Sequence, residues 1–215
     1  MVIKTFIFNH YQLNTYLLFD SSNEGIIIDA GNSNEEENSI LFNFIDNNNI
    51  NIKGLYYTHA HVDHIVGNNA ILQKYSIKAA AHKDSLLFFE QAPSYAKSLG
   101  FDIPSLILPK IFLKDNDIIR FGESELKVIC TPGHANGSLS YYSENDAFII
   151  VGDVLFRGSI GRTDLPTGNF DLLSKSIVEK LYSLPNNVKV YAGHGPSTTI
   201  GFEKLNNPFV NLTIL

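Results

Sequence analysis

Residues 55–64 read Leu-Tyr-Tyr-Thr-His-Ala-His-Val-Asp-His, an apolar stretch that runs directly into a cluster of polar side chains. Successive residues of an extended chain point in alternate directions, so His59 and His61 face the same way and can bind one metal ion together. Asp63 and His64 then open a helix and can face a second ion. Imidazoles and carboxylates without thiolates suit zinc, iron or manganese. The stretch therefore predicts a metal site that follows a strand.

Three more candidate ligands follow predicted strands in the same way. They are His134 after the strand ending at Cys130, Asp153 after Phe148–Val151, and His194 after Val188–Tyr191. Strand ends hold side chains on a rigid scaffold, and neighbouring glycines permit close approach. Seven candidate ligands are more than one tetrahedral site can use, whereas two ions bridged by one carboxylate would use them all. The alternative is a set of independent capping or core histidines, which this combined pattern disfavours.

Short strands and helices alternate along the rest of the chain. Strands are predicted at Val2–Phe8, Thr15–Phe19, Gly25–Ile28, Leu55–Thr58, Asp117–Phe121, Leu126–Cys130 and Leu139–Tyr142, and helices at Ser33–Asn48, Asp63–Tyr75, Phe170–Leu184 and Thr198–Leu205. Prolines predict a long irregular crossing from Ala92 to Leu113. The segments 1–115 and 116–191 each combine strands with helices, which predicts two sheets packed together with helices outside. We expect one domain over residues 1–215.

Composition limits the class of protein. Of the 215 residues, 44% are hydrophobic and 18% charged, which is enough apolar surface for a core and excludes a disordered or fibrous chain. The net charge of −6 disfavours a nucleic-acid partner. No apolar run approaches the roughly 18 residues of a spanning helix, and none has the form of a signal peptide. We therefore expect a cytoplasmic monomer or homodimer without a membrane partner.

The motifs together resemble one known family. The H-x-H-x-D-H run at 59–64 and the later motifs at 131–134, 152–153 and 193–194 resemble the metallo-β-lactamase superfamily, in its order and over essentially the whole chain. Residues 152–156, 161–164 and 193–196 are most similar to its glyoxalase II-type hydrolases, and to their single-domain bacterial branch. The resemblance implies an α/β (α+β) fold, the αββα four-layer sandwich, with metals at one edge between the sheets.

The resemblance also implies a set of site residues. The first metal would be held by His59, His61 and His134, and the second by Asp63, His64 and His194, with Asp153 bridging. Two divalent ions are expected, zinc first, with iron or manganese as alternatives. Asp29 matches a position that supports the ligands, since a metal-bound imidazole needs an acceptor for its other N–H. Asp63 and Asp153 would orient a metal-bridging hydroxide and take its proton.

These residues imply a metal-dependent hydrolase, and a glyoxalase II-like thioesterase first. S-acyl-glutathione or a similar small thioester is the implied substrate, because a thiolate leaves with little protonation. The lysine and tyrosine that contact glutathione in that family are not reproduced: Arg162 and Asp164 stand there. We also expect the helical extension of two-domain members to be absent. Hydrolysis is thus better supported than glutathione recognition.

Two other activities remain open. Persulfide dioxygenases share the fold and hold one iron through two His and one Asp, which here would be His59, His134 and Asp153. The retained His194 argues against that assignment. Hydrolysis of a lactone or phosphodiester is a further alternative.

Four side chains near the motifs have competing roles. Arg157 and Arg162 follow Asp153 and could bind a substrate carboxylate, or form surface ion pairs, with Asp164 a candidate partner. We interpret His10 as a surface or structural residue. His82 is expected at a boundary between a strand and a helix, outside the site.

Overall fold

The computed structural model describes residues 1–210 as two compact units, each built on a six-stranded sheet. The first unit contains residues 1–113 and 120–125, and the second contains 114–119 and the chain from residue 126 on. In the described residues no helix is long and apolar enough to cross a bilayer.

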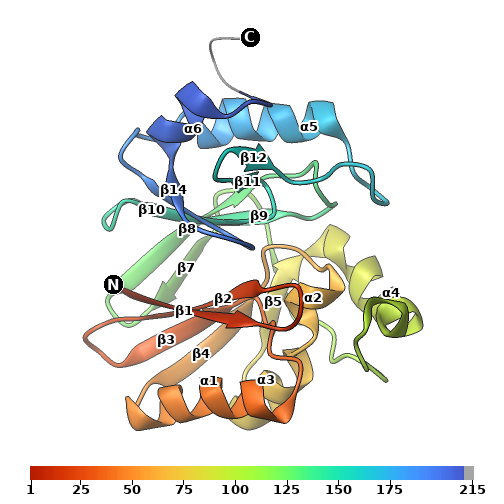
Figure 1. Cartoon of the computed structure of the whole chain (residues 1–215). Coiled ribbons are helices and arrows are strands. Elements are labelled where there is room, and N and C mark those ends of the chain that lie inside the picture. The colour runs from red at the N-terminus through yellow and green to blue at the C-terminus, as the bar shows by residue number, and fades with distance from the viewer. Residues whose placement is uncertain (211–215) are drawn as a thin grey trace. The chain divides into compact units, whose positions relative to one another are not determined.

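The first unit consists of a sheet with helices along one face (Figure 1). Its strands, in spatial order, are β1 (Val2–Phe8), β2 (Leu13–Phe19), β3 (Glu24–Ile28), β4 (Asn51–Tyr56), β5 (Ala79–His82) and β6 (Ile111–Leu113). Its helices are α1 (Glu35–Asn47), α2 (Val62–Ile65), α3 (Asn68–Tyr75) and α4 (Leu86–Tyr95), with 3-10 turns η1 (Lys83–Ser85) and η2 (Ala96–Leu99). Strands β1 to β3 are antiparallel and β3 to β6 are parallel.

Local sequence explains the helix boundaries in this unit. The Asn34 side chain caps α1 by accepting from the Glu37 N–H, so the helix begins at Glu35 and not at Ser33 as predicted. The helix predicted over Asp63–Tyr75 is divided into α2 and α3. The division falls at Gly67, where any side chain would overlap the Asn32 side chain.

The segment predicted to be irregular from Ala92 is partly helical. α4 runs through Pro93 to Tyr95, and η2 continues it to Leu99. A proline inside a helix removes one N–H donor and crowds the carbonyl four residues earlier, but Pro93 is the third-last residue of α4, and the Ala96 N–H beyond it still donates to the Ala92 carbonyl. Only the stretch from Phe101 to Lys110 lacks regular structure, and β6 follows it.

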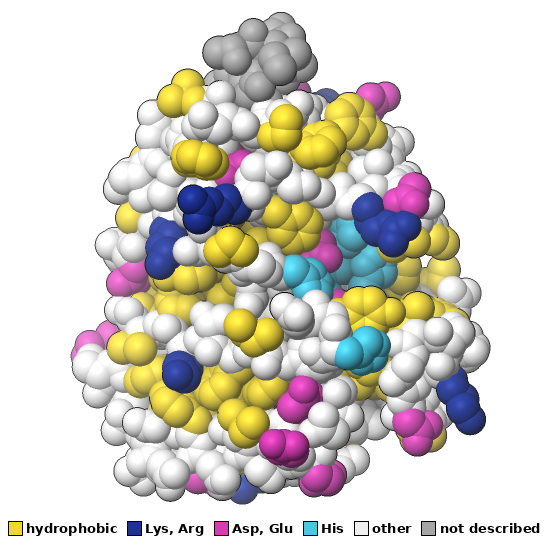
Figure 2. Space-filling view, viewed as in Figure 1, with side chains coloured by type: hydrophobic (Ala, Val, Ile, Leu, Met, Phe, Trp, Pro, Cys, Tyr) yellow, Lys and Arg dark blue, Asp and Glu magenta, His cyan; other side chains and the backbone are white. Residues whose placement is uncertain are grey.

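The second unit repeats this plan with its own sheet and helices (Figure 1). Its strands, in spatial order, are β14 (Thr198–Thr199), β13 (Lys189–Ala192), β10 (Phe148–Gly152), β9 (Leu139–Ser143), β8 (Ser124–Cys130) and β7 (Ile118–Phe121), and a separate hairpin joins β11 (Leu155–Phe156) to β12 (Ser159–Ile160). The helices are α5 (Phe170–Lys175), the π-helical turn η3 (Ser176–Leu181) and α6 (Ile200–Asn206). Hydrophobic side chains also lie on the surface over α5 and α6, among them Phe170 and Leu205 (Figure 2).

Two predicted helices differ slightly from the structure here. The helix predicted to reach Leu184 ends at Leu181. The helix predicted from Thr198 starts at Ile200, because Thr198 and Thr199 pair with β13 as β14 and the Thr199 side chain caps α6. Leu173, Ile177 and Leu181 are fully buried and form the core of this unit with β10 and β13.

One buried carboxylate ties the turn at residues 120–125 to the first sheet. Asp20 follows β2 and accepts hydrogen bonds from the Ser22 N–H and hydroxyl, the Glu123 N–H and the Ser124 hydroxyl. Burial opposes ionisation of Asp20, but these four hydrogen bonds outweigh it and lower its pKa to about 2. The carboxylate therefore favours the folded chain when ionised.

Asp20→Asn is expected to lower the free energy of unfolding at pH 7 by about 1–2 kcal/mol. The stabilisation is present above the unfolded pKa of about 3.9 and is lost as the pH falls towards about 2, so the gap between the two proteins should narrow below pH 4. Urea denaturation at pH 7, 4 and 3 measures this gap, with the exposed Asp102→Asn as control. A gap equally large at pH 3 would contradict the prediction.

Candidate metal centre

Two parallel strands bring Asp29 to the histidine motif of the first unit. Ile28 at the end of β3 pairs with Tyr56 at the end of β4, and the Asp29 N–H donates to the Tyr56 carbonyl at 2.9 Å. Parallel strands end at the same edge of a sheet, so Asp29 lies beside Thr58. The Thr58 N–H donates to Asp29 Oδ1 at 2.8 Å. That bond replaces a strand partner, which is why β4 ends at Tyr56 and not at Thr58 as predicted.

Asp29 orients two of the imidazoles. Its fully buried carboxylate accepts from His64 Nδ1 at 2.9 Å and from the Thr58 hydroxyl at 2.7 Å. Because that hydroxyl donates to Asp29, it accepts from His59 Nδ1, 3.2 Å away. The Nδ1 atoms of both histidines therefore carry protons, and each Nε2 presents a lone pair on the opposite side of its ring. Thr58 is a supporting residue that the sequence analysis did not identify.

The nitrogen and oxygen atoms of the motif converge as ligand atoms would. His59 Nε2 and His61 Nδ1 are 3.0 Å apart, and the His59 and His64 ring centroids are 4.0 Å apart. His64 Nε2 lies 3.7 Å from Asp63 Oδ2. His59 and His64 are buried, whereas the Asp63 side chain is 16% exposed. Imidazole nitrogens packed beside an accessible carboxylate form a donor set that fits a divalent transition metal.

The same strand geometry brings together two of the three candidate ligands of the second unit. β10 and β13 are parallel, Gly152 pairs with Ala192, and the Gly193 N–H donates to the Gly152 carbonyl at 2.8 Å. Asp153 and His194 consequently leave the sheet at one edge. Asp153 Oδ2 lies 3.6 Å from His194 Nε2 and 3.8 Å from His134 Nε2. These separations are too long for good hydrogen bonds and close to the roughly 3.3 Å between two ligands of a tetrahedral zinc ion.

A backbone carbonyl orients His134. His134 Nδ1 lies 2.8 Å from the Arg162 carbonyl oxygen, which can only accept, so Nδ1 carries the proton and Nε2 faces Asp153. Gly161 makes this approach possible, because a Cβ there would overlap the Asp153 carbonyl oxygen and lie 3.0 Å from His134 Nδ1. Side-chain motifs do not reveal a backbone carbonyl that accepts a hydrogen bond from a histidine. The adjacent glycine was the only signal of this contact in the sequence.

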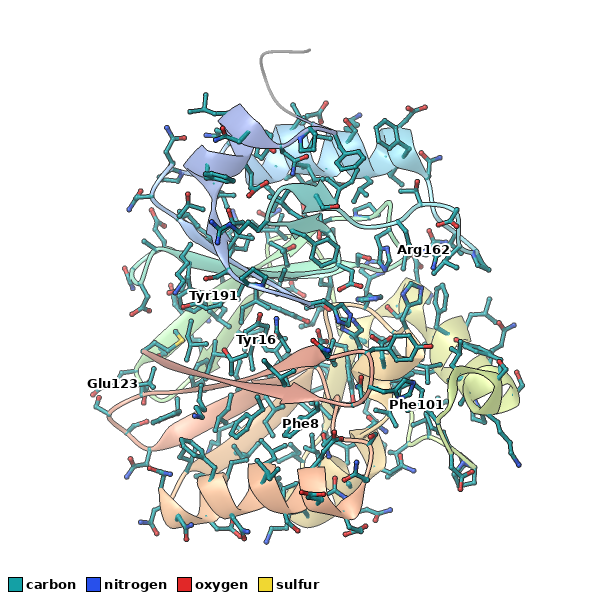
Figure 3. All side chains as sticks on the ribbon, in the orientation of Figure 1. Phe8, Tyr16, Phe101, Glu123, Arg162 and Tyr191 are labelled. Atoms are coloured by element: carbon teal, nitrogen blue, oxygen red, sulfur yellow. The ribbon has the colours of Figure 1, made fainter. Side chains whose placement is uncertain are left out.

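The guanidinium of Arg162 already has a partner. Its Nε and Nη2 atoms donate to the two oxygens of Asp164 at 2.8 and 2.7 Å, and this ion pair lowers the pKa of Asp164 to about 2. The pair is exposed (Figure 3). Arg157 lies over the Phe202 ring, 5.9 Å from its centroid. The surface ion pair is thus formed at Arg162, and binding of substrate by either arginine stays a prediction.

The other two histidines have structural contacts in the first unit. His82 ends β5, and its Nδ1 accepts from the Asp84 N–H at the start of η1. His10 is exposed, donates from Nε2 to the Leu99 carbonyl at 3.0 Å, and lies on the Phe101 ring with centroids 4.7 Å apart.

Comparison with known proteins agrees with this architecture. The sequence model of the metallo-β-lactamase superfamily matches residues 9–194. The chain belongs to this superfamily. Its membership confirms the predicted fold class, a mixed α/β chain with two sheets and flanking helices. It also places the chain among metal-dependent hydrolases.

Three similar members of the superfamily span nearly the whole chain. Hydroxyacylglutathione hydrolase GloC of Haemophilus influenzae is 34% identical over 204 residues, which cover 94% of each protein. Among solved structures, BLEG-1 B3 metallo-beta-lactamase is 33% identical with a TM-score of 0.89 and covers 97% of this chain and 99% of its own. TTHA1623 in a di-iron-bound form is 32% identical with a TM-score of 0.85, and the match covers 96% of this chain and 99% of TTHA1623.

Proposed function

We propose that the chain is a binuclear metal-dependent thioesterase. One ion would be held by His59, His61 and His134, the other by Asp63, His64 and His194, and Asp153 would bridge them. The observation that carries the proposal is the position of Asp153 Oδ2, 3.8 Å from one imidazole Nε2 and 3.6 Å from another. A carboxylate so placed suits a ligand shared by two ions.

Two relatives support the two parts of this proposal. The 34% identity to a hydroxyacylglutathione hydrolase favours thioester hydrolysis. The similarity to a protein solved with two irons favours a pair of ions, with iron as strong a candidate as zinc.

Bound divalent ions supply an acidified water and an electrophile for the substrate carbonyl. The residues of the chain divide the other tasks. Asp63 and Asp153 are 16% and 14% exposed, so their carboxylates can hold the attacking water and accept its proton. Asp29 and the Arg162 carbonyl accept from the Nδ1 atoms of His64 and His134, so that each Nε2 is the atom left to face an ion. The leaving thiolate, with a parent pKa of about 8.5, needs no dedicated acid.

The competing dioxygenase activity makes a different use of His194. A single iron held by His59, His134 and Asp153 would leave His194 without a ligand role. Its Nε2 lies 3.6 Å from Asp153 Oδ2, close enough to share an ion with that carboxylate. His194→Ala should therefore remove one of about two ions and most thioesterase activity. If His194→Ala retained one iron and full persulfide-dependent oxygen uptake, the result would favour the dioxygenase.

The deciding experiment is elemental analysis of untagged protein purified without chelators, followed by two assays of the same sample. We expect about two ions per chain, hydrolysis of acyl-thiol substrates, and no oxygen uptake with glutathione persulfide. One iron per chain with persulfide-dependent oxygen uptake would overturn the proposal.

A further inference from the structure

A turn in the first unit is fixed to the segment that carries Asp63. Asn9 lies between β1 and β2 in a left-handed conformation, with φ of 51°. Its side-chain amide donates to the Gly31 carbonyl at 3.0 Å and the Asp63 carbonyl at 3.1 Å, and its N–H donates to Glu37 Oε1 at 2.7 Å. Its Oδ1 accepts from the Tyr11 N–H at 2.9 Å. The turn thus holds Tyr11 at a set distance from a proposed ligand.

The turn presents a stack of aromatic rings. The Tyr11 and Phe101 rings are stacked, with centroids 5.7 Å apart and an interplanar angle of 25°. Phe101 is only 4% exposed, whereas Tyr11 is 44% exposed. Gly100 allows this packing: it has φ of 83°, and a Cβ there would lie 3.2 Å from the His10 ring. A buried ring thus supports an exposed one, and hydrophobic side chains adjoin an exposed histidine in this unit (Figure 2).

α4 adds two more rings beside the same ligands. Phe88 and Tyr95 are seven residues apart and so lie on one face of the helix. The Phe88 ring is edge-on to the His61 ring, with centroids 5.7 Å apart. The Phe88 and Tyr95 side chains are both partly buried and pack against the hydrophobic core of the first unit. We call Tyr11, Phe101, Phe88 and Tyr95 the aromatic border.

The charge around the aromatic border is unsuited to an anionic carrier. Residues 9–12 and α4 contain no Lys or Arg, and α4 contributes Glu90. Two carboxylates of a glutathione moiety would find no Lys or Arg on these elements, where His10 is the one side chain that can become a cation. Apolar or aromatic groups, in contrast, gain about two- to tenfold in affinity from each well-placed ring in addition to the effect of buried area.

Given the proposed thioesterase function, we propose that the aromatic border binds an aryl or similarly apolar substituent of the thioester. The chain then prefers aryl-bearing thioesters to hydroxyacyl conjugates of glutathione. Tyr11 and Phe88 are specificity residues in this proposal, and Asn9 is a positioning residue that acts through Tyr11.

The test compares kcat/KM on thioesters that differ in one group. S-phenylacetyl-N-acetylcysteamine is compared with S-acetyl-N-acetylcysteamine, S-benzyl thioacetate and S-lactoylglutathione, which separates a ring on the acyl side from one on the thiol side. We expect kcat/KM for at least one of the two aryl substrates to exceed that for S-acetyl-N-acetylcysteamine and for S-lactoylglutathione by about tenfold. Tyr11→Ala and Phe88→Ala should each reduce that ratio about two- to tenfold. Tyr11→Phe keeps the aromatic ring and should leave the ratio at the parental value.

Controls separate binding from folding and from the proposed function. Phe209→Ala removes an aromatic side chain that is 53% exposed in the other unit and should leave the ratio unchanged. Calorimetric titration with phenylacetate and acetate measures ring binding without turnover. Preference for S-lactoylglutathione, or a ratio unaffected by Tyr11→Ala and Phe88→Ala, would overturn the aromatic border while thioesterase activity stands. Failure to hydrolyse any thioester with both ions bound would overturn the proposed function itself.

Discussion

Asp153→Ala is expected to lower kcat/KM for thioesters by at least about a thousandfold and to reduce bound metal from about two ions to one or fewer. Loss of a residue that only orients a ligand costs about 10- to 100-fold in metal affinity or activity. Loss of Asp153 should reduce metal affinity and activity further, because its Oδ2 lies near both His134 Nε2 and His194 Nε2 and would bridge the ions. Elemental analysis and steady-state kinetics on the same preparation measure both effects.

A matched control tests whether the effect belongs to the metal centre. Asp171→Ala removes an exposed carboxylate from the first turn of α5 in the same unit, and should leave metal content and kcat/KM within about twofold of the parent protein. Circular dichroism establishes that both variants fold. An Asp153→Ala protein that is depleted of metal yet hydrolyses thioesters at the parental rate would refute the binuclear model.

Asp29→Asn is expected to weaken metal binding about 10- to 100-fold and to lower the free energy of unfolding by about 1.5–3 kcal/mol. Asn tolerates the left-handed backbone of this position, where φ is 59°, so the change isolates the loss of the carboxylate. One amide oxygen cannot replace two carboxylate oxygens that accept from the Thr58 N–H, the Thr58 hydroxyl and His64 Nδ1. Chelator competition and urea denaturation of metal-free protein measure the two effects separately.

Thr58→Val provides a graded comparison for Asp29→Asn. It removes the hydroxyl between His59 Nδ1 and Asp29 but keeps the direct bond from His64 Nδ1 to Asp29. Thr58→Val should therefore reduce metal affinity less than Asp29→Asn does. If Asp29→Asn bound both ions as tightly as the parent protein, the orienting role of Asp29 would be refuted.

Much of the site could be predicted because its residues follow apolar strands. Asp29, His59, His134, Asp153 and His194 all come shortly after β3, β4, β8, β10 and β13. Within each sheet one parallel pair, β3 with β4 or β10 with β13, brings two of these strand ends to one edge of that sheet. Short apolar runs that end in polar motifs are visible in a single sequence. The roles assigned to these ligands remain predictions until metal binding is measured.

Features that depend on tertiary contacts were not predictable in the same way. At the break between α2 and α3, the Gly67 N–H donates to the Ala30 carbonyl and the Ala30 N–H donates to the His64 carbonyl, so the backbone bonds there go to a distant segment. The orientation of His134 depends on the Arg162 carbonyl, and every residue has such a group. The continuation of α4 through Pro93 contradicts a local preference that the rest of the helix outweighs. In the first two cases a hydrogen bond to a distant segment decides between local alternatives.

Gly161 limits how this enzyme could be re-engineered. A larger side chain there would collide with the Asp153 backbone and crowd the ring of His134, so the position is closed to all other residues. At the hairpin tip a Cβ on Gly158 would meet nothing within 4 Å, but its φ of 69° is a left-handed conformation that favours glycine. Library designs that seek new substrates should therefore diversify residues 157, 159 and 160 and keep glycine at 158 and 161. Variation of specificity and retention of metal could then be selected independently in adjacent positions of one short loop.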